Sequence, residues 1–319
     1  MQIFLLGKPY KQVVLVCLAF LKIGVFASPV YVLNNPGGIK TITMFDGGGS
    51  SSGFTSTGLS APAAITFGGG NLYALNAGAS GSPSIIKYDS SGNSSLFANS
   101  YMSDPVALAY FNGNLYVLND GVSGSPSISM FNSDGQGSIF AGANSGMSHP
   151  VSLAAGGGNL FALNETGSYE TITMFDGNGT SSGFTSSGLS ASVAILYGGG
   201  NLYALNAGIS GFPTITKYDA FGTPSLFANS YMSVPVAMAY DNGILYVLND
   251  GISGSPTITM FDSLGQGSVF AGVNSGMSNP ISIAIEPVPE PTGFGLLLTG
   301  SGLVAVINKA RKVARVVGM

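Results

Sequence analysis

A short pattern of apolar and polar positions returns six times along the middle of the chain. Each copy has four consecutive aliphatic or aromatic residues followed by an asparagine, as in Val30–Asn34. Successive copies are 42, 43, 45, 42 and 43 residues apart, and their asparagines are Asn34, Asn76, Asn119, Asn164, Asn206 and Asn249. A repeat of this length is typical of a four-stranded propeller blade. The pattern therefore predicts an all-β fold, a six-bladed β-propeller.

Four strands are expected in each copy. In the third copy they are predicted at Val106–Phe111, Asn114–Asn119, Ser127–Asn132 and Ser138–Gly142, short apolar runs bounded by Gly, Asn, Asp or Pro. Every third strand ends in Asp or Asn with a glycine three residues later, as in Asp46 and Gly49. This spacing favours a type I turn, in which the first side chain accepts backbone N–H groups. We interpret these acidic residues as turn formers in preference to a ring of metal ligands.

The two ends of the repeat region complement each other. The chain enters at Ser28 in the middle of a blade, and it ends the region with 279–285, which matches the first strand of another copy at 149–155. The C-terminal segment is therefore expected to complete blade one and to close the ring, which removes an open sheet edge.

A second, longer repetition overlies the first. Copies one, two and three match copies four, five and six, and the interval from Asn34 to Asn164 is the same as from Asn76 to Asn206 and from Asn119 to Asn249. We call this common spacing the half-chain interval. The domain 28–286 is therefore predicted to consist of two halves of three blades, related by a near-twofold axis.

Composition and charge narrow the function classes. Only 8% of the residues are charged and 48 are glycines, which suits short strands joined by tight turns. All fourteen acidic residues lie between Asp46 and Glu290, and the repeat region has only three lysines against them. A surface of that sign repels phosphate backbones, so nucleic acid is excluded as a partner. Cys17 is the only cysteine and His149 the only histidine, and a single histidine excludes a multi-His zinc site.

The loops that follow the second and fourth strands of each blade share one face of a propeller. They form the candidate ligand face, with Asn119, Asp120, Asn164, Glu165, Asn249, Asp250, Asp104 and His149. Such oxygen-rich loops can hold Ca²⁺, and no other cofactor is expected. The alternative is that each asparagine caps its own turn. No residue is assigned as catalytic, and no metal ligand is assigned.

The N-terminal segment has the form of a secretion signal. Lys8 and Lys11 precede an uncharged stretch at 12–21, and Ala27 offers a small residue just before Ser28. This order predicts a signal peptide at 1–27 that signal peptidase removes. An uncleaved membrane anchor is the alternative, because Lys22 interrupts the apolar run.

The C-terminal segment has the form of a second targeting signal. Pro289, Glu290 and Pro291 come before an apolar stretch that ends at Asn308, and four basic residues follow, Lys309, Arg311, Lys312 and Arg315. The stretch 292–308 is predicted to form a transmembrane helix whose basic end stays in the cytoplasm. The segment 287–319 resembles the PEP-CTERM sorting domain. That resemblance implies cleavage near Glu290 by an exosortase, a transient stay in the inner membrane, and a link to exopolysaccharide. An ordinary tail anchor is the alternative.

The repeat itself resembles NHL-type repeats and the gluconolactonase-like propellers, through Pro105–Ala109, Gly113–Val117 and Ser129–Phe131. That resemblance implies a divalent metal held by carboxylates at the mouth of the channel, yet the predicted channel strands, such as Ala63–Phe67, carry no glutamate. We therefore expect an exported protein of the cell surface or extracellular matrix that binds or scaffolds exopolysaccharide or another surface protein. A metal-dependent hydrolase or lactonase is the alternative.

Overall fold

The computed structural model describes residues 28–78, 82–121, 125–167, 169–208, 212–252 and 254–287. The predicted signal peptide, the Pro289-Glu290-Pro291 motif and the predicted helix 292–308 lie outside the described residues, and the predictions made for them stay predictions. Within the described ranges, no helix has the length and the apolar character that crossing a bilayer requires.

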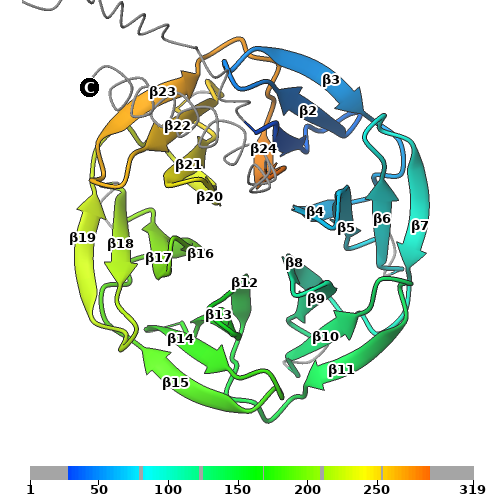
Figure 1. Ribbon diagram of the computed structural model, residues 1–319, viewed down its shortest axis with the longest axis vertical. Coiled ribbons are helices and arrows are strands. Elements are labelled where there is room, and N and C mark those ends of the chain that lie inside the picture. The colour runs from blue at the N-terminus through cyan, green and yellow to red at the C-terminus, as the bar shows by residue number, and fades with distance from the viewer. Residues whose placement is uncertain are drawn as a thin grey trace, which may run out of the picture.

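The described residues form twenty-four strands in six antiparallel sheets of four, arranged as blades around a central axis (Figure 1). This confirms the predicted six-bladed β-propeller. Blade one contains β24 (Pro280–Ile285), β1 (Val30–Asn34), β2 (Thr41–Phe45) and β3 (Ser51–Thr55). Blade two contains β4 (Pro62–Gly68), β5 (Asn71–Asn76), β6 (Ser84–Tyr88) and β7 (Ser94–Ala98). Blade three contains β8 (Pro105–Phe111), β9 (Asn114–Asn119), β10 (Ser127–Phe131) and β11 (Gly137–Ala141).

The second half of the chain forms the other three blades in the same order. Blade four contains β12 (Pro150–Gly156), β13 (Asn159–Glu165), β14 (Glu170–Phe175) and β15 (Ser181–Thr185). Blade five contains β16 (Ser192–Gly198), β17 (Asn201–Asn206), β18 (Thr214–Tyr218) and β19 (Pro224–Ala228). Blade six contains β20 (Pro235–Asp241), β21 (Ile244–Asn249), β22 (Thr257–Phe261) and β23 (Gly267–Ala271). The predicted strands of the third copy differ from the observed strands by no more than one residue at either end.

Blade one is closed by the two ends of the repeat region, as predicted. Strand β24 pairs antiparallel with β1, so that Val30 lies opposite Ile285 and Val32 opposite Ile283. The Glu286 N–H donates to the Pro29 carbonyl at 3.0 Å and extends this pairing beyond the strands. No seam is left between the first and last blades, and β1 is protected from edge-to-edge association.

The turns between the third and fourth strands have the predicted chemistry. The Asp46 carboxylate accepts the N–H groups of Gly48 and Ser50, both at 2.9 Å, and the Gly49 N–H donates to the Asp46 carbonyl at 2.9 Å. Backbone N–H donors in the same arrangement lower the pKa of the exposed Asp219 carboxyl, because they favour its ionised form. The acidic residues at these turns are thus structural. The turn residues of the other five blades are Asp89, Asn132, Asp176, Asp219 and Asp262.

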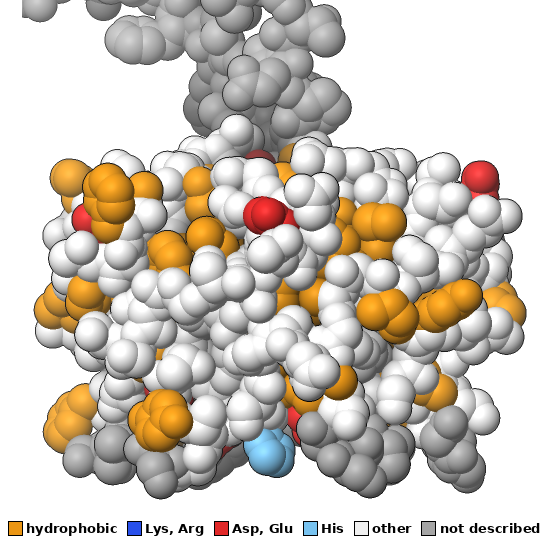
Figure 2. Space-filling model, turned by 90° about the horizontal axis from the view of Figure 1, so that it is seen from below, with side chains coloured by type: hydrophobic (Ala, Val, Ile, Leu, Met, Phe, Trp, Pro, Cys, Tyr) orange, Lys and Arg blue, Asp and Glu red, His pale blue; other side chains and the backbone are white. Residues whose placement is uncertain are grey.

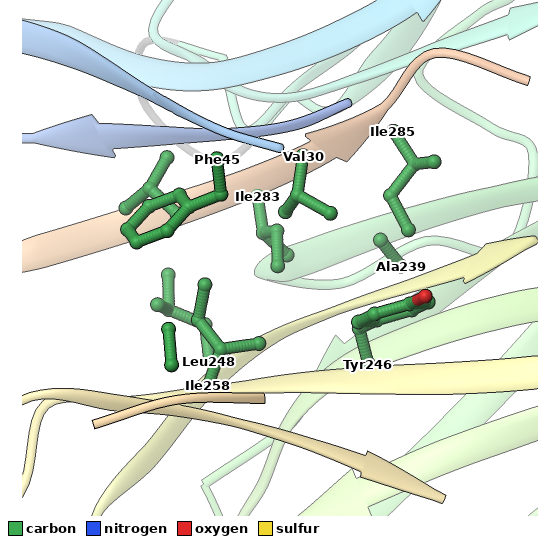
Figure 3. Packing of buried hydrophobic residues seen from close by; sticks show 10 residues of the cluster. Val30, Phe45, Ala239, Tyr246, Leu248, Ile258, Ile283 and Ile285 are labelled. Carbon is green, nitrogen blue, oxygen red and sulfur yellow. The ribbon is translucent and has the colours of Figure 1, made fainter. Parts of the chain in front are cut away.

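The core lies between neighbouring blades. In Figure 3, Val30 and Ile283 of blade one face Leu248 and Ile258 of blade six. Strand β1 is buried at every position, which explains why the second strand of each copy is an uninterrupted apolar run. Each fully buried aliphatic side chain contributes about 1.5–3 kcal/mol relative to exposure, so the blade-to-blade contacts are the main source of stability.

Contacts in the first half of the chain recur in the second half, shifted by the half-chain interval. The rings of Tyr31 and Phe54 meet edge to face with their centroids 5.0 Å apart, and those of Phe161 and Phe184 do the same at 5.2 Å. Blades one and four lie on opposite sides of the ring in Figure 1. The two halves of the sequence therefore build two similar halves of the structure.

Candidate functional site

A central channel is lined by the first strand of every blade. It encloses a cavity of about 370 Å³, and its walls consist mostly of aliphatic side chains with a few hydroxyl groups. The hydroxyls of Ser152 and Ser282 accept the backbone N–H groups of Ile195 and Ile65, both at 3.1 Å. These two serines join neighbouring inner strands, so part of the polar character of the channel is used by its own wall. In the ranges that the structure describes, no group of three or more His, Cys, Asp and Glu side chains lies close enough to hold a metal ion.

The asparagines that end the second strands are buried. Asn119, Asn164 and Asn249 have no exposed surface. The Asn249 side chain accepts the Ser233 N–H at 3.1 Å and donates to the Thr259 hydroxyl at 3.2 Å. In four other blades the asparagine side chain likewise accepts the backbone N–H of the residue sixteen positions before it. In blade one, Asn34 accepts the N–H of Ser278, which comes from the opposite end of the repeat region. These amides fasten the loop between two blades to the second and third strands, and they have no free surface to offer a ligand.

Replacing Asn249 by alanine is expected to lower the free energy of unfolding by about 1–3 kcal/mol, because the Ser233 N–H loses its acceptor and the Thr259 hydroxyl loses one of its two partners. Urea denaturation of the purified ring measures the effect. Asn99→Ala is the matched control, since that side chain is exposed. Equal stability of the two variants would contradict the structural role of Asn249.

Most of the ionisable members of the candidate face lie at the surface. Asp104, His149 and Glu165 are exposed, whereas Asp120 is partly buried. The Asp120 N–H donates to the Asp104 carbonyl at 3.0 Å, and the Glu165 N–H donates to the His149 carbonyl at 3.1 Å. The chain thus brings the blade-to-blade loop and the loop after the second strand together, which is the face predicted from the sequence.

The blade-to-blade loops share an unusual backbone conformation. Asp104 and His149 adopt left-handed φ values of 50° and 44°, and the residues at the equivalent positions do the same. Non-glycine residues seldom adopt this conformation, and it recurs here because every blade crossing needs it. The equivalent residues are Val234, Asn279, Ala61 and Ala191.

Asp120 is the most distinctive acidic residue of this face. One of its carboxylate oxygens is buried and has no hydrogen-bond partner within the described residues. Its counterpart Asp250 is also partly buried, and the Asp250 N–H donates to the Val234 carbonyl at 3.0 Å. A buried carboxylate oxygen without a donor is costly, so Asp120 is the residue of this face with the most to gain from a ligand.

Glu170 takes part in a contact that the sequence reasoning missed. Its carboxylate accepts the Ser192 N–H at 2.8 Å and the Ser192 hydroxyl at 2.7 Å, and so it joins blade four to blade five. The signal was visible in the repeat, because Ser192 stands where the other five copies have proline. Serine carries an N–H that proline lacks, and Glu170 satisfies it.

The buried tyrosines with shifted pKa values belong to the framework. Burial raises the pKa of the Tyr88 phenol to about 12, and its hydroxyl donates to the Thr57 carbonyl at 2.8 Å. Burial, and after it the Glu286 carboxylate, raises the pKa of Tyr31. Burial and then the Glu170 carboxylate raise the pKa of Tyr218. These groups stay protonated at neutral pH and act as hydrogen-bond donors.

Comparison with known proteins supports the fold. No family model matches the sequence, and no curated protein matches it. Among solved structures, a chain of a nidogen/laminin complex is 14% identical, with a TM-score of 0.64 over 81% of this chain and 97% of that one. TolB from Acinetobacter baumannii is 15% identical, with a TM-score of 0.62 over 82% of this chain and 67% of that one.

A gluconolactonase from Xanthomonas campestris is also similar. It is 14% identical, with a TM-score of 0.53 over 69% of this chain and 78% of that one. At these identities the likeness shows the fold alone. The chain is a six-bladed β-propeller with gluconolactonase-like structural neighbours, as the repeat predicted.

Proposed function

We propose that this protein is an exported β-propeller of the cell surface or extracellular matrix, and that it binds or scaffolds other components of the exopolysaccharide layer. The observation that carries the proposal is the chemistry of the exterior. The side of the ring in Figure 2 is mostly uncharged. In the described residues the only Lys and Arg side chains are Lys40, Lys87 and Lys217. Such a surface suits contact with neutral polymers and offers little attraction to polyanions.

The proposed export and surface localisation rest on the two end segments of the sequence. The N-terminal segment supports cleavage after Ala27, and the Pro289-Glu290-Pro291 motif with its apolar and basic continuation supports processing by an exosortase. Ser28 is 4% exposed, and its hydroxyl donates to the Asp241 carboxylate. Cleavage by signal peptidase is therefore expected before the ring folds, while this peptide bond is still accessible.

Mass spectrometry of the protein isolated from its host is expected to find Ser28 as the first residue and a last residue near Glu290. Glu290→Ala is expected to accumulate as a longer form in the membrane fraction, because the motif precedes the predicted apolar helix directly. Thr292→Ala is the matched control and should be processed normally. A wild-type protein that ends at Met319 and stays in the membrane fraction would show that the tail is only an anchor.

A metal-dependent lactonase is the second candidate. The structural likeness to a gluconolactonase and the unpartnered carboxylate oxygen of Asp120 favour it. In that case Ca²⁺ or Mg²⁺ would bind beside Asp104 and Asp120, raise the melting temperature, and be removed by EDTA. Lactone hydrolysis that disappears in Asp120→Asn would establish the enzyme. A melting temperature unaffected by metal and chelator would favour the binding protein.

A further inference from the structure

An open groove lies on the rim of blade one. It has a volume of about 510 Å³, and Gly53 of strand β3 and Gly276 of the loop from blade six form part of its wall. No charged residue is part of the lining. The groove is therefore a neutral surface with several hydroxyl groups, which can both donate and accept hydrogen bonds. The hydroxyls of Thr41 and Thr43 already accept from the Asn34 amide, and Thr43 also donates to the Gly276 carbonyl. The hydroxyl side chains that dominate the wall are Thr41, Thr43, Ser51, Ser52, Thr55 and Ser56.

Blade three shows why the groove is open. At the position of Gly276 it has Tyr101, whose backbone has the same left-handed conformation, with φ of 57° against 78°. The Tyr101 ring lies so close to Gly137 that a Cβ there would meet it at 2.8 Å. Blade one has the opposite arrangement. Gly276 stands in the loop in place of Tyr101, and Ser51 stands on the outer strand in place of Gly137. The space that an aromatic ring occupies in blade three is therefore empty in blade one.

The central residue of the outer strand differs in the same way. Blades one and four have Gly53 and Gly183 there, and a Cβ at either position would meet nothing within 4 Å. Blades one and four alone combine this glycine with a glycine in the preceding loop. The other four blades have exposed aliphatic residues at the same position, namely Leu96, Ile139, Leu226 and Val269.

Blade four has the same residues as those that line the groove of blade one. Gly146 and Gly183 are separated from Gly276 and Gly53 by the half-chain interval, and the threonines and serines of the wall are likewise the same. The Thr173 hydroxyl donates to the Gly146 carbonyl at 3.2 Å, and in blade one the corresponding bond from Thr43 to Gly276 is 3.3 Å. The residues that line the groove of blade one thus have identical counterparts at the rim of blade four, on the opposite side of the ring.

We propose that the groove of blade one and its counterpart at the rim of blade four bind neutral glycan chains, an inference that rests on the surface-binding function proposed above and deepens it. Ser51 and Ser52 are exposed, and their hydroxyls are available to a ligand. Sugar hydroxyls complement such groups, since each can donate and accept. A charged ligand would lose hydration without gaining an ionic partner in this lining. An added peptide strand would use the backbone edge that all six outer strands share, and that edge does not explain why blades one and four differ.

The test is calorimetric titration of the full chain with neutral hexasaccharides derived from dextran, cellulose and mannan, with oligogalacturonate as the charged probe. Wild-type protein is expected to bind at least one neutral probe at two sites per ring and to show no binding of oligogalacturonate. Gly53→Leu is expected to leave one site, and Gly53→Leu with Gly183→Leu to weaken binding more than tenfold. Leucine is tolerated, because blades two and five carry it at the same position. Leu96→Ile is the matched control and should bind as wild type.

The inference would be overturned by wild-type protein that binds no neutral glycan, by unchanged binding in the double leucine variant, or by a preference for oligogalacturonate or an extended peptide. Circular dichroism of each variant confirms that the ring is folded. The outcome is separable from the proposed export, since processing at Ser28 and Glu290 is measured independently. A processed protein that binds no glycan would refute only the proposal of glycan binding. Glycan binding by a protein that is never processed would refute only the proposal of export and processing.

Discussion

Deletion of residues 279–286 is expected to abolish the folded ring. These residues include all of β24, which supplies the inner strand of blade one and buries Ile283 and Ile285 against blade six. Without them, β1 becomes an uncovered edge of apolar residues, and such edges associate with other chains. The lost side-chain burial alone is worth about 1.5–3 kcal/mol for each isoleucine. That loss adds to the missing strand pairing, and it is large against the total stability of about 5–15 kcal/mol that is common for a domain.

Size-exclusion chromatography and thermal unfolding measure this effect. The deletion variant is expected to elute as aggregates and to lose its cooperative unfolding transition. A chain that ends at Pro287 is the control, because it retains β24 and the hydrogen bond of Glu286 to Pro29. It should behave as an intact ring. A monomeric deletion variant that melts at the wild-type temperature would show that closure contributes little.

Gly265→Ala is expected to destabilise the ring strongly, although Gly265 lies in a turn at the rim. Its φ is 76°, and a Cβ would lie 2.1 Å from the Phe227 carbonyl oxygen of blade five. Left-handed backbone costs an L-residue roughly 1–2 kcal/mol, and forcing atoms into a packed contact adds about 1–3 kcal/mol. The free energy of unfolding should therefore fall by about 2–5 kcal/mol in chemical denaturation.

Gly243→Ala separates these two costs. Its φ is 86°, yet a Cβ would meet nothing within 4 Å. It should show only the backbone cost, and the difference between the two variants is the contribution of the contact between blades five and six. Equal destabilisation by both substitutions would mean that the Phe227 carbonyl moves away without cost.

These glycines have one role that the sequence predicts and another that it does not. The repeat predicted the turn at Asp262 and the need for glycine three residues later, because both follow from local backbone chemistry. It did not predict that Gly265 lies against a carbonyl of the neighbouring blade, as Gly49 does against Phe270. Contacts of this kind depend on how two sheets pack, and no periodicity within one blade encodes them.

The candidate site was predicted less completely than the fold. The sequence placed Asn249 at the end of a strand on the ligand face, but the direction of its side chain depends on Thr259, which the fold brings from the next strand. The rim groove is easier to recognise in the sequence. The third copy has Tyr101 and Gly137 at the positions where the first copy has Gly276 and Ser51. Only the folded ring shows that the two positions share one space.

The half-chain interval has a consequence for the material that such a protein would help to build. Because blades one and four lie across the ring from each other, a short glycan held in one groove has no access to the other. Each molecule would then connect two separate polymer strands. Strands joined at many points by such two-ended connectors are held by avidity, even where each contact is weak. Duplication of three blades within one chain would thus have given a single ring two glycan sites and made it a cross-linker, and the stiffness of the resulting layer would follow the ratio of protein to polymer.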